Sequence, residues 1–353
     1  MIYANINTSR EQKTPVSLPT VTLYQCLFNE CQFNRCQFIQ RIFSVFQKES
    51  TMRFIQKTIL TNVLWLTLLG QISFAEIYEI DDLTQAKDIA EQAASAYGMR
   101  NVLVVFDIDN TILANKVSIG SDQWFEWQAH LIKTGDLSNA IATTTGELYR
   151  KGALLYSISP MRQTQQNASE ILHAINDQGF WTMALTARSP ANRDATLREL
   201  ATNAFEFSTN APIAHPARPG HYMPLHPQYP QQSGLSHEEV QQFKLNSPRK
   251  VSYEQGVMMV AGQHKGAMLR TVLYASTLNP KAVVFVDDKV KNLTHVEEAL
   301  TPLGIEVHAL RYSGEDSNVE AFHASDKSTE IAAWQQLEQT LVNIFPIASA
   351  ASF

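Results

Sequence analysis

Short apolar runs that end in polar side chains recur along the chain after residue 100. Val102–Phe106, Phe180–Leu185 and Ala282–Val286 are nearly uninterrupted apolar runs of five or six residues. Such runs are typical of strands buried on both faces of a parallel sheet. Because open α/β sheets bind ligands at the carboxyl ends of their strands, the polar residues that follow each run are candidates for a site.

Weaker patterns predict the rest of the sheet. Gly304–Leu310 predicts a last strand, and Ala204–Ser208 predicts a short one. Lys250–Tyr253 and Val257–Ala261, separated by Glu254-Gln255-Gly256, predict a hairpin.

Segments with apolar residues at helical spacing alternate with these strands. The predicted helices are Asp81–Tyr97, Asp122–Thr134, Asp136–Lys151, Gln163–Gln178, Asn192–Leu200, Ala267–Thr277, Val290–Leu303 and Glu330–Phe345. Alternating strands and helices predict an α/β fold with a central parallel sheet.

The segment between Thr111 and Trp181 is predicted to be a mostly helical insertion. It follows the first buried strand directly, so it is well placed to cover a site there and exclude water. Trp124, Phe125 and Trp127 lie close together near its start, which fits either a hydrophobic core or a platform for a substrate. A second long connection, rich in Pro, Gln and His, runs over approximately residues 211–249.

The first 51 residues predict no independent domain. Cys26, Cys31 and Cys36 recur every five residues, each followed two positions later by Phe, which is similar to a pentapeptide repeat. A solenoid needs several stacked turns to bury a core, and this segment supplies barely one. A zinc site is the alternative, but the spacing of the cysteines is not a usual ligand spacing.

Met52–Ala75 has the pattern of a secretory signal peptide. Arg53 and Lys57 precede an apolar run, Thr58–Leu69, and small residues occupy the positions before Glu76 that a signal peptidase recognises. The alternative is a buried helix of the main domain. Because 51 residues precede this pattern, the simplest interpretation is that translation starts at Met52. We therefore expect a mature domain of residues 76–353, located in the periplasm or secreted, with no stable membrane span after cleavage.

The composition argues against a nucleic-acid partner and against disulfide bonds in the main domain. The chain has 353 residues, is 44% hydrophobic and 18% charged, and carries a formal net charge of −6 with a pI near 5.9. A nucleic-acid-binding protein would need a basic patch, so we expect no nucleic-acid partner. No cysteine follows Cys36, so no disulfide can stabilise the main domain.

The chemistry is concentrated where the buried runs end. Asp107 and Asp109 follow the first run, Thr186 and Arg188 end the second, and Asp287-Asp288 end the third. Lys265 precedes the third run, at the start of a predicted helix. Two carboxylates at i and i+2 lie on the same face of an extended chain, where their negative charges repel each other. A bound divalent cation usually compensates such charges.

These residues, taken in order, resemble the four motifs of the haloacid dehalogenase superfamily. The motifs are Asp107-Ile108-Asp109-Asn110-Thr111, then Thr186, then Lys265, then Asp287-Asp288. The resemblance covers about Leu83 to Leu310. It implies a Rossmann-like core, with the helical insertion (approximately 114–160) as a cap domain. The Tyr-x-x-Gly hairpin and the signal peptide together resemble an uncharacterised branch of secreted bacterial members.

The resemblance and the residues themselves predict the same roles. Asp107 would attack phosphorus and form an aspartyl-phosphate, and Asp109 would act as general acid and then general base. Thr186 and Lys265 would hold the phosphoryl oxygens, and Arg188 would contact the substrate or the cap.

Mg²⁺ is the expected cofactor. Asp107, Asp287 and the backbone carbonyl of Asp109 would bind it, and Asp288 would bind it through water or orient Lys265.

The expected function is a Mg²⁺-dependent phosphomonoesterase that acts on a small phosphorylated substrate. One alternative keeps the aspartyl-phosphate and transfers the phosphoryl group to another acceptor. A second alternative, from a different class, is a secreted binding or effector protein that keeps the fold and has lost turnover.

Overall fold

The computed structural model describes residues 77–214 and 220–345. The predicted N-terminal extension (1–51) and signal peptide (52–75) lie outside the described residues. Within those two ranges, no helix is both long and apolar enough to cross a membrane.

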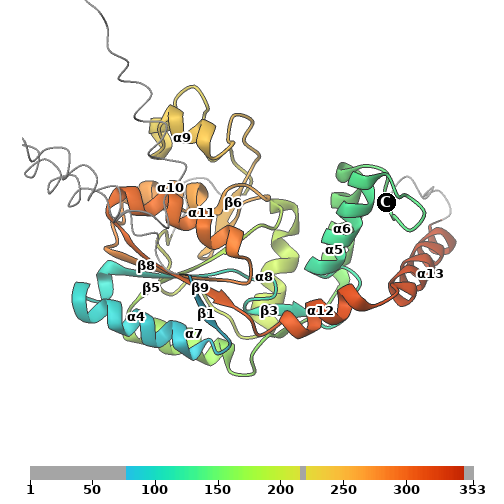
Figure 1. Ribbon diagram of the computed structural model, residues 1–353, viewed down its shortest axis with the longest axis horizontal. Coiled ribbons are helices and arrows are strands. Elements are labelled where there is room, and N and C mark those ends of the chain that lie inside the picture. The colour runs from blue at the N-terminus through green and yellow to red at the C-terminus, as the bar shows by residue number, and fades with distance from the viewer. Residues whose placement is uncertain (1–76, 215–219, 346–353) are drawn as a thin grey trace, which may run out of the picture. The chain divides into compact units, whose positions relative to one another are not determined.

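A mostly parallel sheet of seven strands forms the centre of the described chain (Figure 1). Its strand order is β1-β9-β8-β2-β5-β7-β6, and only β6 is antiparallel to its neighbour. A separate antiparallel pair, β3–β4, follows the first motif. The strands are β1 (Tyr78–Ile80), β2 (Val102–Phe106), β3 (Leu113–Asn115), β4 (Met161–Gln163), β5 (Trp181–Thr186), β6 (Ser252–Glu254), β7 (Val257–Met259), β8 (Ala282–Asp287) and β9 (Glu306–Tyr312).

Ten α-helices are found among the described residues. They are α4 (Thr84–Tyr97), α5 (Asp122–Thr134), α6 (Thr145–Ile158), α7 (Ala168–Gln178), α8 (Arg193–Thr202), α9 (His237–Gln242), α10 (Lys265–Ser276), α11 (Val290–Leu300), α12 (Asp316–Ala324) and α13 (Ser328–Ile344). Helices α4 and α7 cover one face of the sheet, and α10 and α11 cover the other (Figure 1).

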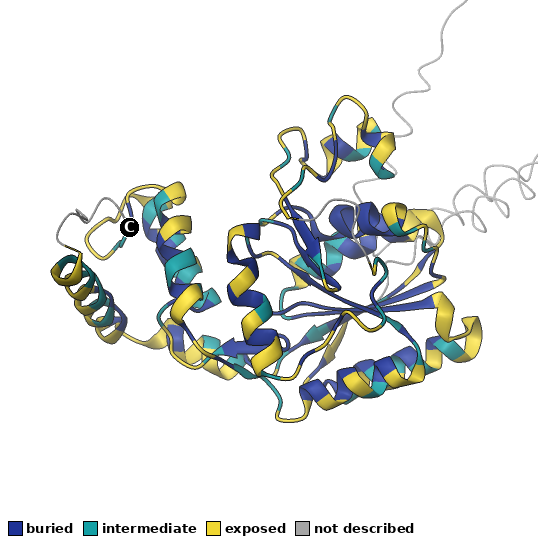
Figure 2. Ribbon diagram, turned by 180° about the vertical axis from the view of Figure 1, so that it is seen from behind, coloured by how far each residue is buried: buried dark blue, intermediate teal, exposed yellow. Residues whose placement is uncertain are grey.

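Alternate side chains of each central strand pack into the two hydrophobic cores, one on each face of the sheet. In β2, Val102, Val104 and Phe106 pack with α4 and α7, whereas Leu103 and Val105 pack with α10 and α11. Side chains in a strand point alternately to opposite faces, so an uninterrupted apolar run fits a strand covered on both sides. All five residues of β2 are buried, as are the central strands in Figure 2. The predicted α/β fold with a central parallel sheet is confirmed at this level.

Most predicted strands are confirmed, and one is wrong. Ala204–Ser208 forms no strand: Ala204 has a φ of 61°, and the Phe205 amide donates to the carbonyl of Leu200. The chain turns here as it leaves α8. Phe205 and Phe207 are buried by packing against the core rather than by pairing in the sheet, which is why their apolar pattern is misleading.

Helix boundaries follow local capping. Asp122–Thr134 is confirmed as α5, where the Ser121 side chain accepts from the Trp124 amide and Gly135 ends the helix in a left-handed conformation.

The prediction of Asp136–Lys151 is wrong in its bounds, because Thr144 caps a helix that starts at Thr145 and runs to Ile158. The helix predicted from Gln163 starts at Ala168 instead, because Met161–Gln163 pairs with β3.

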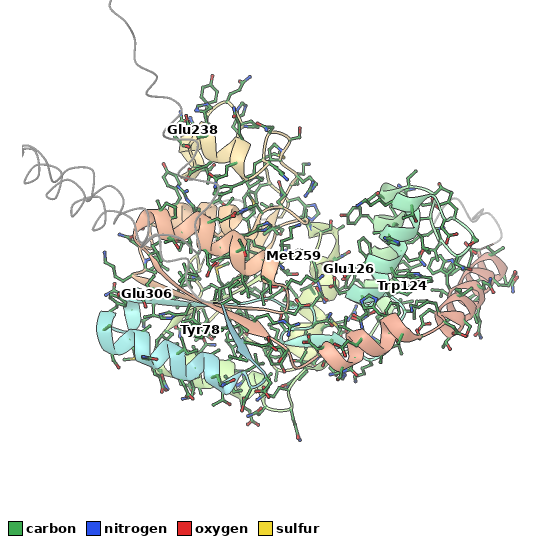
Figure 3. The ribbon with its side chains drawn as sticks, viewed as in Figure 1. Tyr78, Trp124, Glu126, Glu238, Met259 and Glu306 are labelled. Carbon is green, nitrogen blue, oxygen red and sulfur yellow. The ribbon has the colours of Figure 1, made fainter. Side chains whose placement is uncertain are left out.

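Four helices form a unit with a core of its own, called here the helical unit (α5, α6, α12 and α13). Trp124, Leu148 and Leu155 from the insertion pack with Phe322 and Trp334 from the C-terminal helices. Trp124 belongs to α5 and is 1% exposed. Figure 3 shows it on the side of α5 that faces α13. Trp124 is therefore a core residue, and the insertion buries its apolar face only with the help of α12 and α13.

Candidate active site

The sheet order brings the four sequence motifs to one edge. Strands β8, β2, β5 and β7 are consecutive neighbours and run parallel, so their carboxyl ends lie together. Asp107 follows β2, Thr186 ends β5, and Asp287 ends β8. Lys265 is the first residue of α10, shortly after β7.

Lys265 lies between two buried carboxylates. Its ammonium is 2.7 Å from Asp107 Oδ1 and 2.7 Å from Asp287 Oδ2, and the three residues are 1%, 5% and 0% exposed. Burial lowers the pKa of Lys265, but the two carboxylates outweigh burial, so its pKa lies above the ordinary value. Lys265 therefore stays charged in this position.

Asp287 accepts more hydrogen bonds than Asp107 or Asp288 among the described residues. Its Oδ1 accepts from the backbone amide of Lys289 and from Asn292 Nδ2, each at 2.9 Å, while Oδ2 accepts from Lys265. Three donors on one carboxylate fix its orientation. No sequence motif points to Asn292, although its place in the first turn of α11, five residues after Asp287, is a usable signal.

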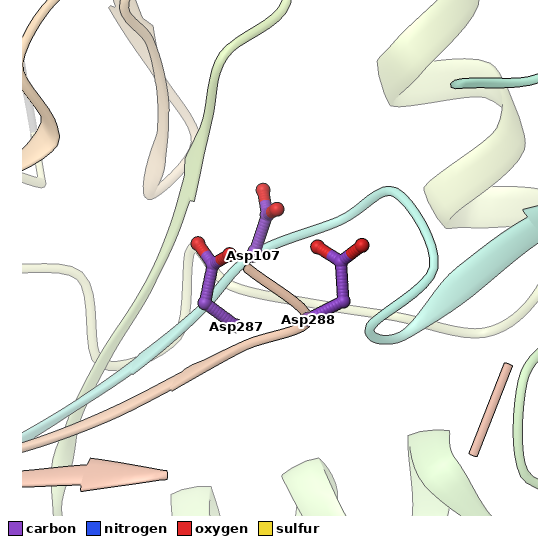
Figure 4. A group of neighbouring side chains, drawn as sticks. All are labelled: Asp107, Asp287 and Asp288. Carbon is purple, nitrogen blue, oxygen red and sulfur yellow. The ribbon is translucent and has the colours of Figure 1, made fainter. Parts of the chain in front are cut away.

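Asp107, Asp287 and Asp288 form a carboxylate cluster (Figure 4). One oxygen from each lies within 4.8 Å of the others. Burial, together with the neighbouring carboxylates, raises the pKa of Asp107 to about 7 even though Lys265 opposes the rise. Burial likewise raises the pKa of Asp288 well above its ordinary value. The cluster thus carries more negative charge than its protein partners offset.

The carboxylate cluster fits a divalent cation. Asp288 Oδ1 is buried and has no hydrogen-bond partner among the described residues. Asp107 Oδ1 contacts Lys265 closely but makes no hydrogen bond. Carboxylate oxygens at this spacing are the ligands that Mg²⁺ prefers, and the ion would compensate charge that is costly to bury.

Asp109 points away from the carboxylate cluster and pairs with Arg188. The guanidinium contacts both carboxylate oxygens: Nε lies 2.8 Å from Oδ2, and Nη2 lies 2.7 Å from Oδ1. Of the predicted metal ligands Asp107, Asp109, Asp287 and Asp288, the side chains of Asp107, Asp287 and Asp288 lie together and that of Asp109 lies apart. The predicted contribution of Asp109 is through its backbone carbonyl and stays a prediction.

The Arg188 guanidinium makes three further contacts besides its pairing with Asp109. Nη1 donates to Thr196 Oγ1 at 2.9 Å, Nη2 lies 3.1 Å from Met161 Sδ, and the guanidinium carbon is 4.7 Å from the centre of the Tyr156 ring. Tyr156 belongs to α6 of the helical unit. Burial lowers the pKa of Arg188, but Asp109 outweighs it and the net shift is upward. Arg188 thus connects the end of β5 to the helical unit.

Thr186 is fully buried at the end of β5, and its hydroxyl accepts from the Arg188 amide at 3.2 Å. Thr111 is equally buried, and its hydroxyl accepts from the Asp288 amide at 3.0 Å. Thr111 therefore ties the turn after β2 to the turn after β8. Thr111 belongs to the first motif, but its sequence position alone does not predict this contact.

The turn after β2 holds its shape through its own backbone. The amides of Thr111, Ile112 and Leu113 all donate to the carbonyl of Ile108. Asn110 has a φ of 55°, a left-handed conformation that Asn tolerates better than most residues. The polar side chains at this strand end are therefore on a rigid turn.

Lys289 links the site to the helical unit. Its ammonium lies 2.5 Å from Asp122 Oδ2 and also contacts Glu126 Oε1, both on α5. Figure 3 shows Glu126 on the side of α5 that faces the sheet. Sequence patterns could not identify these ion pairs, because Lys289 is more than 160 positions away from both Asp122 and Glu126.

The Pro/His-rich connection (approximately 211–249) packs on the core over much of its length. Leu225, Leu235, Val240 and Phe243 are buried with α10 and α11. His221 Nε2 lies 3.1 Å from the carbonyl of Pro190, shortly after the second motif.

Comparison with known proteins identifies a family that covers most of the chain. A family model described as "Protein of unknown function (DUF2608)" matches residues 82–345. No curated protein and no solved structure matches the chain.

Proposed function

This chain belongs to the DUF2608 family of proteins of unknown function, and we propose that it is a Mg²⁺-dependent phosphomonoester hydrolase of the haloacid dehalogenase type. The observation that carries the proposal is the buried Lys265 between Asp107 and Asp287, next to the under-compensated Asp288. This arrangement supplies an acidic nucleophile, a cation for phosphoryl oxygens and oxygen ligands for a metal within one small space.

The order of elements supports the same proposal. The motif residues occur in the order that the superfamily resemblance requires, and they follow β2, β5, β7 and β8, which are adjacent in the sheet. The helical unit contacts this edge through Tyr156 on Arg188 and through Asp122 on Lys289. We infer that it serves as the cap.

Asp107 is the proposed nucleophile. One of its oxygens attacks phosphorus, the bond to the leaving oxygen breaks, and an aspartyl-phosphate forms. Lys265 stabilises the negative charge on the phosphoryl oxygens, and its own charge is secured by Asp287. Thr186, buried at the neighbouring strand end, is the proposed hydroxyl donor to the same oxygens.

Mg²⁺ would be held by Asp107, Asp287 and Asp288, with the backbone carbonyl of Asp109 as the further protein ligand. When bound, it would offset the charge of the carboxylates and of the phosphoryl oxygens.

Asp109 is the proposed general acid and base. It protonates the leaving alkoxide and then takes a proton from the water that releases phosphate. Because Arg188 holds both of its oxygens, one of these contacts must open as Asp109 takes up this role. Arg188 is accordingly a positioning residue for Asp109 rather than a free substrate contact.

Export to the periplasm or beyond is proposed on the Met52–Ala75 pattern alone.

Hydrolysis of p-nitrophenyl phosphate by the purified protein, with and without Mg²⁺, tests the proposal. We expect Mg²⁺-dependent release of nitrophenol, and a loss on the order of 10³-fold or more in kcat for Asp107→Asn, because that variant removes the nucleophile. Asp177→Asn, an exposed carboxylate at the end of α7, is the matched control and should keep full activity.

Turnover that survives Asp107→Asn would exclude the aspartyl-phosphate. A folded protein that binds Mg²⁺ but hydrolyses no phosphomonoester would favour phosphoryl transfer to another acceptor, or a binding protein.

A further inference from the structure

A cavity of about 530 Å³ is lined by the segment that follows α9, the loop before α10 and one face of α11. Neither Lys265 nor any member of the carboxylate cluster belongs to its lining. Clefts of roughly 300–1,000 Å³ are the usual size of small-molecule sites in proteins. The cavity is therefore a candidate second site, distinct from the proposed active site.

Basic side chains predominate in this cavity. Lys244, Arg249 and Lys291 line it, and among the described residues only Glu298 contributes a carboxylate to the lining. None of the three basic residues forms an ion pair with a described residue. Lys291 lies in the first turn of α11, which has no acidic residue, so its charge opposes the helix dipole. A bound anion would offset both the excess positive charge and this unfavourable position.

His264 provides a buried hydrogen-bond donor in the same cavity. Burial, reinforced by His295 and Lys291, lowers the pKa of His264 to about 3, so the ring is neutral. Its Nδ1 accepts from the backbone amide of Ala267 at 3.1 Å, so the proton of the ring is on Nε2. Nε2 is buried and forms no hydrogen bond with a described residue, and Glu298 Oε2 lies 3.5 Å away. Because a buried N–H without an acceptor is costly, this atom indicates a missing acceptor.

Stacking fixes the orientation of this donor. The rings of Phe243 and His295 both stack with the ring of His264, which is only 9% exposed. His295 also lines the cavity, and its Nδ1 is likewise buried without a hydrogen-bond partner in the described part of the chain. Polar groups that are held in place before a ligand arrives lower the entropic cost of binding it.

We propose that this cavity binds a small organic molecule through a phosphate group. The oxygens of a phosphate dianion only accept hydrogen bonds, as the His264 N–H requires, and ammonium and guanidinium groups are their usual partners in proteins. With its histidines neutral, the lining carries an excess of two positive charges, which a dianion cancels. The volume leaves room for an organic part beside the phosphate group.

Calorimetric titration of the full-length protein with phenylphosphonate tests the proposal. This ligand is a dianion at pH 8 that phosphomonoester hydrolysis cannot consume, and EDTA in the buffer removes any metal that would assist binding at the proposed active site. Benzenesulfonate, which has nearly the same shape and one charge fewer, is the comparison ligand. We expect saturable binding of phenylphosphonate and at least about fivefold weaker binding of benzenesulfonate, because one charge is lost.

Inorganic phosphate, titrated in parallel, separates the phosphate group from the organic part. We expect it to bind at least about threefold more weakly than phenylphosphonate, since it fills only part of the cavity. Equal affinity of the two would contradict an organic ligand.

Three variants assign the binding to this cavity. Lys244→Gln should weaken phenylphosphonate binding about fivefold, and Glu298→Gln should strengthen it about fivefold, because the first removes an attracting charge and the second a repelling one. The matched control is Lys281→Gln, which removes an exposed charge just before β8, outside the cavity, and should change the affinity less than twofold.

Absence of phenylphosphonate binding, equal affinity for benzenesulfonate, or an affinity that neither Lys244→Gln nor Glu298→Gln changes would overturn the proposal. Binding at the proposed active site would give the last of these results, because neither residue contacts that site. Since the readout is binding without metal, the result stands whether or not the protein hydrolyses phosphomonoesters.

Discussion

Gly266 lies at the closest approach of α10 and α11, one residue after Lys265. A Cβ atom at this position would lie 1.8 Å from the carbonyl oxygen of His295, a distance that real contacts do not allow. The same backbone approach brings the start of α10, and with it Lys265, next to the ends of β2 and β8. The glycine is thus required by the packing of two helices, and the position of Lys265 depends on it.

Gly266→Ala should destabilise the protein by several kcal/mol, because α10 must move away from α11 to admit the methyl group. The matched control is Gly146→Ala on α6, where a Cβ would meet nothing within 4 Å. That change should be neutral or stabilise by about 0.5–1 kcal/mol, the ordinary helix propensity difference. Urea denaturation of both variants measures the effect, and equal stabilities would contradict the steric argument.

At the scale of elements, three stacked rings join α10, α11 and the connection after α9. The ring centres of Phe243 and His264 are 4.2 Å apart, and those of His264 and His295 are 3.9 Å apart. Burial, reinforced by neighbouring positive charge, lowers the pKa of His264 to about 3 and that of His295 to about 4. The stack therefore holds both imidazoles neutral.

The contribution of His264 and His295 to stability should fall as the pH is lowered from 7 to 5. In the unfolded chain both histidines have a pKa near 6.5, so below that pH the unfolded state binds more protons than the folded state. Their contribution is complete above pH 6.5 and is lost toward pH 4, with a limiting slope of about 1.4 kcal/mol per pH unit for each histidine.

His295→Phe keeps the ring and removes one titrating group. Lowering the pH from 7 to 5 should therefore change its free energy of unfolding less unfavourably than that of the unchanged protein. His173→Gln, on the exposed side of α7, is the control and should behave like the unchanged protein. Denaturation curves at the two pH values decide the question; a wild-type slope in His295→Phe would refute it.

At the scale of the whole molecule, folding brings together acidic groups that the unfolded chain keeps apart. Asp107 and Asp288 are 181 positions apart in the sequence, yet their carboxylate oxygens lie within 4.8 Å in the fold. The hydrophobic cores on both faces of the sheet hold this arrangement against the repulsion. A divalent cation that binds only the folded state would therefore also stabilise it.

Mg²⁺ should raise the Tm of the protein by several degrees, since a ligand present at 100 times its Kd contributes about 2.7 kcal/mol. Asp288→Asn should raise the Tm without metal, because one repelling charge is gone, and should reduce the further rise caused by Mg²⁺. Asp177→Asn should show the full rise. Calorimetry with Mg²⁺ or with EDTA makes the measurement, and an identical Mg²⁺ response in Asp288→Asn would argue against this metal site.

The sequence by itself determined the central strands and the strand ends that carry polar residues. A run such as Val102–Phe106 is apolar at every position, and only a strand covered on both faces can bury all of it. Helix ends with a strong local cap, such as Ser121 and Gly135 around α5, were equally predictable. The polar residues after each apolar run were also predicted to gather at one edge, because the carboxyl ends of parallel strands lie at the same edge of a sheet.

Only the tertiary structure decided which of these side chains contact one another. Asp107 and Asp109 lie two positions apart, but one turns to Lys265 and the other to Arg188, because the turn after β2 is held by the carbonyl of Ile108. Helix α13 completes the core around Trp124 from more than 200 positions away, and Glu330 acquires its burial only there. Local pattern encodes which face of an element is apolar, whereas the partner of that face is set by packing over the whole chain.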